Sequence, residues 1–211
     1  MKIIKKRLGR DFYLQPTLKA AKELLGKYIV HRLGGKRLVG KIVETEAYIG
    51  PQDKASHAYG GKVTKRNRAE YLIGGHIYIY LVYGMYWQLN ISTGPEGRPE
   101  CVLIRALEPI SGYKNPKFKT LNPKQIQNSK FKIQNFPNGP GKLCRWLKLD
   151  KSFYGEDLTK SKRIWLEDRG EKISKSKIVA SKRIGIDYAG KYWADKKWRY
   201  YIKDNPCVSK T

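Results

Sequence analysis

The pattern at residues 76–82 constrains the fold most strongly, because apolar and aromatic residues alternate there as His-Ile-Tyr-Ile-Tyr-Leu-Val. Successive side chains of a β-strand point to opposite faces, so the pattern predicts a strand with isoleucines on one face and tyrosines on the other. Residues 83–84, Tyr-Gly, interrupt the strand, and residues 85–92 resume it as a second one. The chain is therefore expected to be built around a β-sheet.

Further strands and two short helices are predicted elsewhere. Gly34 and Gly35 separate β-rich runs at 27–33 and 36–48, which predicts a hairpin. Other predicted strands cover 102–107, 164–167, 178–184 and 199–202, and helices are predicted at 17–25 and 140–147. Because strands do not alternate with long helices, we expect the α+β class: a mixed, largely antiparallel curved β-sheet with packed helices.

One domain is expected to span residues 1–211, an ordinary length for a single core. Residues 1–10 are interpreted as a basic arm. Residues 111–139 are rich in Lys, Asn, Gln and Pro and contain no acidic residue, so we interpret them as a solvated basic excursion from the same domain. Residues 50–68 are irregular and polar, which makes them a candidate functional loop.

The charge of the chain indicates its class of partner. It carries 44 Lys and Arg against 18 Asp and Glu, a formal net charge of +26. Such an excess attracts polyanions, and counterion release favours binding to nucleic acid, although a basic surface that serves only solubility is the alternative. No apolar run approaches the ~20 residues of a membrane-spanning helix, and no secretory signal is recognisable. We expect no membrane role and a cytoplasmic location, associated with the nucleoid in a bacterial cell.

The cysteines and histidines argue against several kinds of site. The three cysteines are widely spaced and form no Cys-x-x-Cys pair, which indicates neither a disulfide framework nor a zinc ribbon. The three histidines also lack metal-ligand spacing. We therefore expect neither a metal nor a cofactor.

Two of the rare acidic residues lie close together near the end of a predicted strand. Alternation places Glu44, Glu46 and Tyr48 on one face, with ~7 Å between successive members. A buried carboxylate is uncommon unless it is paired or used in chemistry. The plainer interpretation is a solvated acidic face, or ion pairs with the abundant Lys and Arg. The spacing does not choose between the two glutamates.

Aromatic residues gather around the interruption at Gly84, namely Tyr78, Tyr80, Tyr83, Tyr86 and Trp87. Stacking platforms for unstacked bases have this composition, and each base contact contributes ~1–3 kcal/mol. Ordinary sheet packing produces similar aromatic ladders. Residues 65–68, Lys-Arg-Asn-Arg, form a compact basic cluster, and we expect Arg66 and Arg68 to contact the backbone of a nucleic acid.

A series of longer motifs runs through the chain. It comprises Val-Glu-Thr-Glu-Ala-Tyr-Ile-Gly-Pro at 43–51, then Asp53, Ala55 and His57, Arg-Asn-Arg at 66–68, Tyr-Ile-Tyr-Leu-Val-Tyr-Gly-Met-Tyr at 78–86, Asn-Ile-Ser at 90–92, Val-Leu-Ile-Arg-Ala-Leu-Glu-Pro at 102–109, Gly-Pro-Gly-Lys-Leu-Cys at 139–144 and Arg-Ile-Gly-Ile at 183–186. In this order the motifs resemble those of the alkyladenine (3-methyladenine) DNA glycosylases. The resemblance runs from about residue 7 to about residue 209.

The resemblance implies a monofunctional DNA glycosylase of base excision repair. Such an enzyme flips alkylated or deaminated purines, of the 3-methyladenine and hypoxanthine type, out of duplex DNA and excises them. It is expected to act as a monomer without a cofactor. By the same resemblance, Tyr83 intercalates into the duplex in place of the extruded nucleotide. Tyr48 would stack on one side of the base, and His57 with Tyr80 on the other. Asn90 is expected in the pocket wall, where it disfavours the exocyclic amine of guanine.

The resemblance also assigns the hydrolytic residues. Glu46 is expected to take a proton from water and to offset the positive charge of an oxocarbenium-like transition state. Arg105 would help to hold that water, together with a backbone carbonyl near Ile186. Two alternatives stay open, namely a non-catalytic basic nucleic-acid-binding protein, in which the glutamates are structural, and a hydrolase that acts on free nucleotides.

Overall fold

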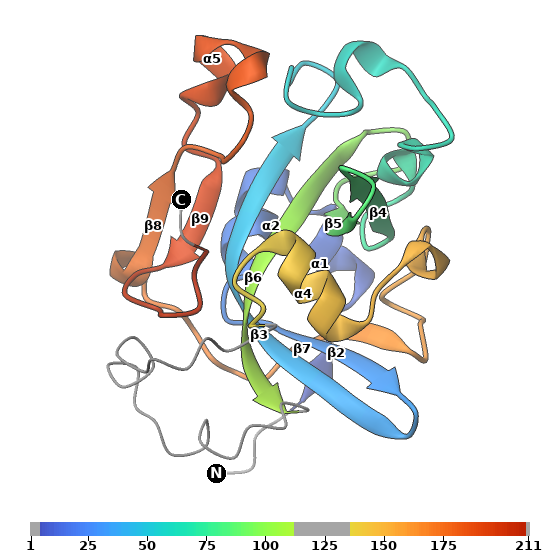
Figure 1. Cartoon of the computed structure of the whole chain (residues 1–211), viewed down its shortest axis with the longest axis vertical. Helices are drawn as coiled ribbons and strands as arrows, with labels where there is room; N and C mark the ends of the chain where they lie inside the picture. Colours follow the sequence, from blue (N-terminus) through green and yellow to red (C-terminus); the bar gives the residue numbers. More distant parts are fainter. Residues whose placement is uncertain (1–4, 112–135, 210–211) are drawn as a thin grey trace.

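The computed structural model describes residues 5–111 and 136–209, which contain one nine-stranded sheet (Figure 1). All its strand pairs are antiparallel. The strands follow the order β1 (Lys6–Arg7), β7 (Ile164–Asp168), β2 (Tyr28–Leu33), β3 (Lys36–Ile49), β6 (Glu100–Ser111), β5 (Tyr86–Ser92) and β4 (Ile77–Val82). Two further strands, β8 (Ile178–Ser181) and β9 (Arg199–Ile202), pair with each other, and β9 also pairs with β3. The predicted α+β class is confirmed.

Strand β3 is the centre of the sheet, because it pairs along nearly its whole length. Its first half forms the predicted hairpin with β2 through Gly34 and Gly35, which have positive φ values of 52° and 73°. Its second half lies between β6 on one edge and β9 on the other, and the register with β6 shifts between residues 42 and 45. Residues 42–47 are all buried as a result. The acidic residues of this strand therefore lie inside the protein.

Four helices lie within the described residues: α1 (Arg10–Leu14), α2 (Thr17–Glu23), α4 (Pro140–Leu147) and α5 (Lys191–Ala194). Helix α2 packs on β3, and α4 packs on β5 and β6 (Figure 1). Ile77 and Ile79 join Leu143 and Leu147 of α4 in one apolar core, where full burial of each side chain contributes about 1.5–3 kcal/mol. The tyrosines of β4 face away from this core, as the alternation predicts.

The structure differs from the sequence prediction at the N-terminal end of the described chain. Residues 1–10 were expected to form a basic arm, but β1 pairs with β7 and Leu8 is buried. This pairing joins residues that are about 160 positions apart, so no local pattern announces it. The prediction of one domain over 1–211, with a basic excursion at 111–139, falls partly on residues 112–135 outside the described ranges and stays a prediction.

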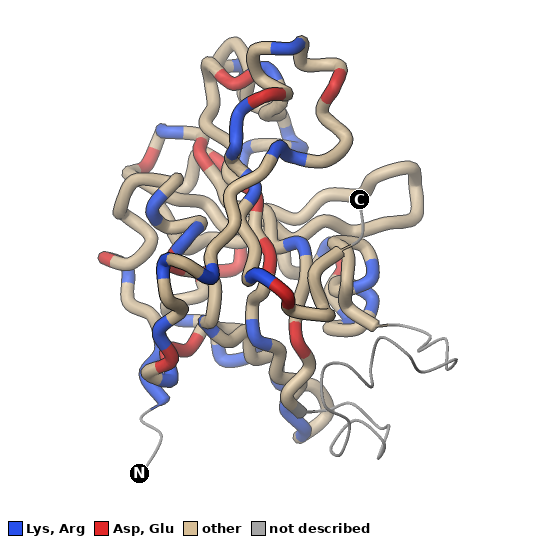
Figure 2. Tube along the Cα trace, turned by 90° about the vertical axis from the view of Figure 1, so that its left-hand side faces the viewer, with Lys and Arg blue, Asp and Glu red and all other residues tan. Residues whose placement is uncertain are grey.

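Basic residues occur on many segments of the described chain rather than in one stretch (Figure 2). Helices long and apolar enough to cross a membrane do not occur in the described ranges. The same ranges contain no cluster of three or more His, Cys, Asp or Glu that could hold a metal ion. The three cysteines are buried and unpaired.

Candidate active site

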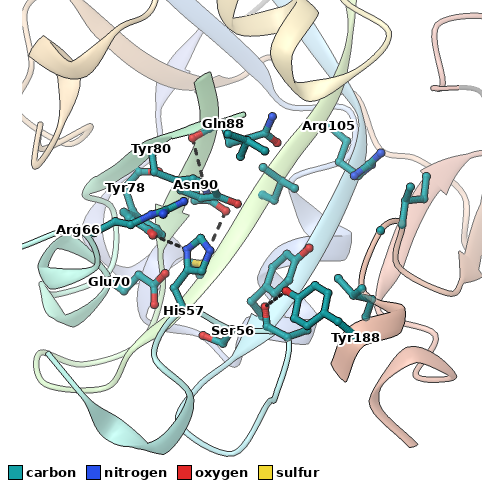
Figure 3. A pocket seen from close by; sticks show the side chains of 18 of the residues that line it. Ser56, His57, Arg66, Glu70, Tyr78, Tyr80, Gln88, Asn90, Arg105 and Tyr188 are labelled. Atoms are coloured by element: carbon teal, nitrogen blue, oxygen red, sulfur yellow. Dashed lines mark hydrogen bonds between the residues drawn. The ribbon is translucent and has the colours of Figure 1, made fainter. Parts of the chain in front are cut away.

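A cavity of about 340 Å³ opens beside the tyrosine face of β4 (Figure 3). Its walls come from the end of β3, the 50–68 loop, strands β4 to β6 and the 184–188 segment. Among the predicted site residues, those that line it are Tyr48, His57, Arg66, Tyr80, Tyr83, Asn90 and Arg105. The volume is in the range of small-ligand sites. The fold therefore brings residues from segments that are distant in the sequence together in one cavity.

Aromatic rings form two walls of the cavity. Tyr48 lies under the Arg183 guanidinium, which is 4.7 Å from the centre of its ring. His57 meets Tyr80 edge to face, with 4.5 Å between ring centroids, and His57 Nδ1 lies 2.6 Å from the Tyr78 hydroxyl in a hydrogen bond. Burial of the His57 ring, followed by the positive charge of Arg66, lowers the pKa of His57, so the ring is neutral near pH 7.

Asn90 lies in the pocket wall, and hydrogen bonds hold its side chain. Its side-chain Nδ2 donates hydrogen bonds to the backbone oxygens of Tyr78 (3.2 Å) and Gln88 (3.3 Å), and the residue is buried. These bonds fix which edge of the amide is available to a bound molecule. An amide fixed in this way can select among bases by their hydrogen-bonding groups.

Tyr83 protrudes from the tip of the β4–β5 hairpin. Its side chain is 86% exposed although it lines the cavity mouth, and its φ is 51°. Gly84 follows with φ 67°, and Met85 N donates to Val82 O, so two left-handed residues make the turn. A bulky residue in the left-handed region costs of order 1–3 kcal/mol, and such strain is typical of functional sites. The turn holds an aromatic ring in solvent beside the cavity.

The two candidate glutamates have different partners, although Arg105 contacts both. Glu44 Oε1 accepts from Arg105 Nε (3.0 Å) and Arg199 Nε (2.7 Å), and Glu44 Oε2 accepts from the backbone N–H of Ser209 (2.8 Å). Neither Arg199 nor Ser209 lines the cavity. Glu44 therefore ties β3 to β6, β9 and the chain segment near residue 209.

Glu46 is surrounded by cavity-lining residues. Its Oε2 accepts from the Tyr48 hydroxyl (2.8 Å), its Oε1 accepts from Ile184 N–H (2.8 Å), and Arg105 Nη1 lies 3.3 Å from Oε1. Burial by itself would lower the pKa of Arg105. The negative charges of Glu46 and Glu44 outweigh burial, and the pKa of Arg105 is raised. Burial, followed by the charge of Glu46, raises the pKa of Tyr48, which therefore stays a hydrogen-bond donor.

Glu46 itself is fully buried and is not one of the residues that line the cavity. It lies directly behind the wall that Tyr48, Arg105 and Ile184 form. The 184–186 segment approaches Glu46 through the N–H of Ile184. The role of a backbone carbonyl near Ile186 in holding water stays a prediction of the resemblance. The spacing along β3 left the two glutamates equivalent, and the contacts separate them.

The two arginines of the 65–68 cluster lie differently. Arg66 and Arg68 are both exposed, as a contact with a nucleic acid backbone requires. Arg66 lines the cavity, and its guanidinium is 5.1 Å from the centre of the Tyr80 ring. Arg68 does not line the cavity.

Two further residues matter at the site, and sequence reasoning did not single them out for a role. Asp53 forms a buried ion pair with Arg183, in which Nη2 donates to Oδ1 over 2.9 Å. Asp53 belongs to a recognised motif, but only its partner reveals its role. Glu70 lines the cavity and is buried. Its neighbours Ala69 and Tyr71 carry no signal that distinguishes it from a surface acid.

The sequence matches a known protein family over most of its length. The sequence model of the methylpurine-DNA glycosylase family matches residues 11–206. The chain belongs to this family. Its membership confirms the enzyme class expected from the sequence, a DNA-3-methyladenine glycosylase that hydrolyses N-glycosyl bonds, and DNA as its substrate.

Individual relatives of the methylpurine-DNA glycosylase family cover nearly the whole chain. A protein of Clostridium perfringens strain SM101, named as a candidate 3-methyladenine DNA glycosylase, is 48% identical over 204 residues, which are 97% of this chain and 99% of that protein. A protein of Desulfitobacterium hafniense with the same name is 47% identical over 204 residues, 97% of this chain and 98% of its own. The DNA-3-methyladenine glycosylase of Mus musculus is 43% identical over 206 residues, covering 96% of this chain and 61% of the mouse protein.

Proposed function

We propose that this glycosylase flips alkylated and deaminated purines out of duplex DNA, and that it releases them by hydrolysis without cutting the strand. The observation that carries the proposal is the cavity itself. It has aromatic walls from Tyr48, His57 and Tyr80, and an exposed tyrosine lies at its mouth. Arg105 lines the cavity, and the buried Glu46 carboxylate lies behind it. A base inside a duplex cannot reach such a cavity, so it has to rotate out of the stack.

In the proposed reaction, Glu46 takes a proton from water while the water oxygen attacks C1′ of the deoxyribose. The C1′–N bond breaks, and its electron pair leaves with the purine. Each oxygen of Glu46 accepts one hydrogen bond and keeps a further acceptor site, so the carboxylate can bind a water that enters between Tyr48, Arg105 and Ile184. Arg105 has five N–H donors and can hold that water while it contacts both glutamates.

The lining of the cavity supports a water-using enzyme. A glycosylase that also cuts the strand needs an amine nucleophile at the sugar. No lysine lies among the described residues that line the cavity. The protein is proposed to act as a monomer on the DNA of the cell, which in a bacterium is the nucleoid.

The decisive experiment is a panel of duplex oligonucleotides, each with one modified base, incubated with excess enzyme and followed by chromatography of the released base. We expect release of 3-methyladenine and hypoxanthine as free bases, with the strand intact until alkali is added. The non-catalytic alternative predicts binding without release. A nucleotide hydrolase would instead act on free nucleosides and leave the duplexes unchanged.

Replacement of Tyr83 with alanine tests base flipping. The variant loses the ring that occupies the gap in the stack, so we expect release from duplex DNA to fall by about tenfold to a hundredfold, from the ~1–3 kcal/mol of a stacking contact. Release from a single-stranded oligonucleotide, which needs no gap filled, should change far less. The Tyr83→Phe variant is the matched control and should retain activity, because it keeps the ring. Equal losses on both substrates would contradict an intercalating role.

A further inference from the structure

Glu70 is a buried acid in the cavity wall that the proposed reaction does not use. It lies in the short 3₁₀ helix η2 (Arg68–Tyr71), its exposed fraction is 1%, and it lines the cavity. Within the described ranges its Oε2 has no hydrogen-bond partner, and Glu70 belongs to none of the ion pairs. In Figure 3 it lies at the opposite end of the cavity from Arg105.

The ionisable groups around Glu70 are almost all neutral near pH 7. Burial raises the pKa of Cys101 and of four neighbouring tyrosines, Tyr71, Tyr78, Tyr80 and Tyr154, and the pKa of His57 is lowered. The cations of this region, Arg66 and Arg68, are exposed and therefore screened by solvent. Burial is the larger influence on Glu70 and raises its pKa to about 8, against a smaller opposing effect of the Tyr78 hydroxyl.

A buried acid without a cation is unfavourable when it ionises, so its presence in a binding cavity points to a ligand that brings the cation. Alkylated purines meet this requirement. A purine alkylated at N3 or N7 while it is still attached to deoxyribose carries a positive charge, whereas a deaminated purine such as hypoxanthine is neutral. An opposite charge within ~4–6 Å favours the ionised form of a carboxyl group.

We propose that Glu70 is a specificity-determining residue that responds to the charge of the flipped base, releasing its proton to solvent when a cationic alkylated purine enters and then serving as its counter-ion. This inference rests on the proposed function. A neutral purine leaves the proton in place and gains no such attraction. The cavity thereby favours cationic over neutral lesions without any contact that depends on the position of the alkyl group.

If Glu70 acts in this way, the affinity of the cavity for a cationic base depends on pH in a defined direction. The free cavity holds the proton until the pH reaches about 8, whereas the cavity with a cationic base loses it at lower pH. Binding of the cationic base therefore releases up to one proton, and its affinity rises with pH by up to about tenfold per unit. The rise ends near pH 8, where the free enzyme is already ionised. The affinity for neutral lesions does not increase through ionisation of Glu70.

The test compares wild type with Glu70→Gln, which keeps the size and polarity of the side chain but cannot ionise. Release of 3-methyladenine from freshly methylated duplex DNA is measured at subsaturating enzyme, at constant ionic strength, from about pH 6 to about pH 9, with spontaneous depurination subtracted. A duplex with a single hypoxanthine is the neutral substrate. The Glu96→Gln variant, altered at an exposed site outside the cavity, is the matched control.

We expect the ratio of wild-type to Glu70→Gln rates for 3-methyladenine to rise tenfold or more between pH 6 and pH 8 and then to level off. The ratio for hypoxanthine should stay constant. A 3-methyladenine ratio that does not change with pH overturns the inference, whether or not hypoxanthine is released. If wild type releases no methylated purine at any pH, the proposed function fails instead.

A second measurement needs no variant. Wild type is titrated with a duplex that carries a cationic alkylated purine on a sugar resistant to hydrolysis, in two buffers with different ionisation enthalpies near pH 7. The difference in heat gives the number of protons released. We expect between half a proton and one proton more than for a duplex with hypoxanthine on the same sugar. Equal values for the two duplexes overturn the inference.

Discussion

Replacement of Glu46 with glutamine is expected to lower the rate of base release by about a thousandfold or more, while binding to lesion-containing duplex changes by less than about tenfold. The variant removes both the proton acceptor and the negative charge that offsets the oxocarbenium-like transition state. Single-turnover release of 3-methyladenine measures the first effect. A binding titration with a duplex on a hydrolysis-resistant sugar measures the second.

The geometry around Glu46 makes glutamine a sharp substitution. The amide oxygen can still accept from Ile184 N–H, and the amide group can donate to the Tyr48 hydroxyl oxygen, so both contacts can persist. If Glu46 only positions Tyr48 and Arg105, the variant should therefore keep most of its activity. Activity within about tenfold of wild type would reject Glu46 as the base. Glu23→Gln, at an exposed helical site, is the matched control.

Replacement of Asp53 with alanine is expected to have the largest effect on stability, a loss of about 3–5 kcal/mol. Both side chains of the Asp53–Arg183 pair are completely buried. The Asp53 carboxylate also accepts from the N–H groups of Ile49 (3.3 Å) and Ala55 (3.0 Å). The variant leaves a buried guanidinium without its counter-ion, which costs more than the pair contributes when intact.

Urea unfolding measures the loss in the free energy of unfolding of the Asp53→Ala variant. Its melting temperature should also fall, by about 2–4 °C for each kcal/mol lost in a chain of this size. The matched control removes an exposed pair instead. In that pair Lys182 Nζ meets Asp195 over 2.5 Å, with side chains 66% and 43% exposed. Asp195→Ala should change stability by less than about 1 kcal/mol. Similar losses of stability in the Asp53→Ala and Asp195→Ala variants would show that burial does not make the Asp53–Arg183 pair more important for stability than an exposed pair.

The Asp53 pair also links stability to the site. Arg183 lies over the ring of Tyr48 and donates to Ala47 O over 3.0 Å, so it joins the 50–68 loop to the end of β3. When Asp53 is absent, we expect Tyr48 to lose its fixed position. The Asp53→Ala variant should therefore release bases more slowly than wild type even at temperatures where it is folded.

Elements that depend on neighbouring residues were predictable from the sequence. Helix α4 and strand β9 have the predicted bounds, and the alternation at 77–80 correctly separated core isoleucines from cavity tyrosines. The turn at Tyr83 was also visible, because a glycine next to a tyrosine interrupts an otherwise regular pattern. These features arise from backbone preferences and from the period of a strand, which a short window of residues contains.

The environments of the acidic residues could not be read in the same way. Glu44, Glu46 and Glu70 look alike in the sequence. Yet Glu44 contacts β6 and β9, Glu46 lies behind the cavity wall, and Glu70 lines the cavity with an Oε2 atom that has no hydrogen-bond partner within the described ranges. Their roles depend on partners such as Arg199 and Ile184, which lie more than a hundred residues away. The order of residues thus determined most of the strands, the faces of β4 and the family, but not the pairing of β1 with β7. Burial and charge pairing were settled by long-range packing, because the energy of a carboxylate depends on which distant groups surround it.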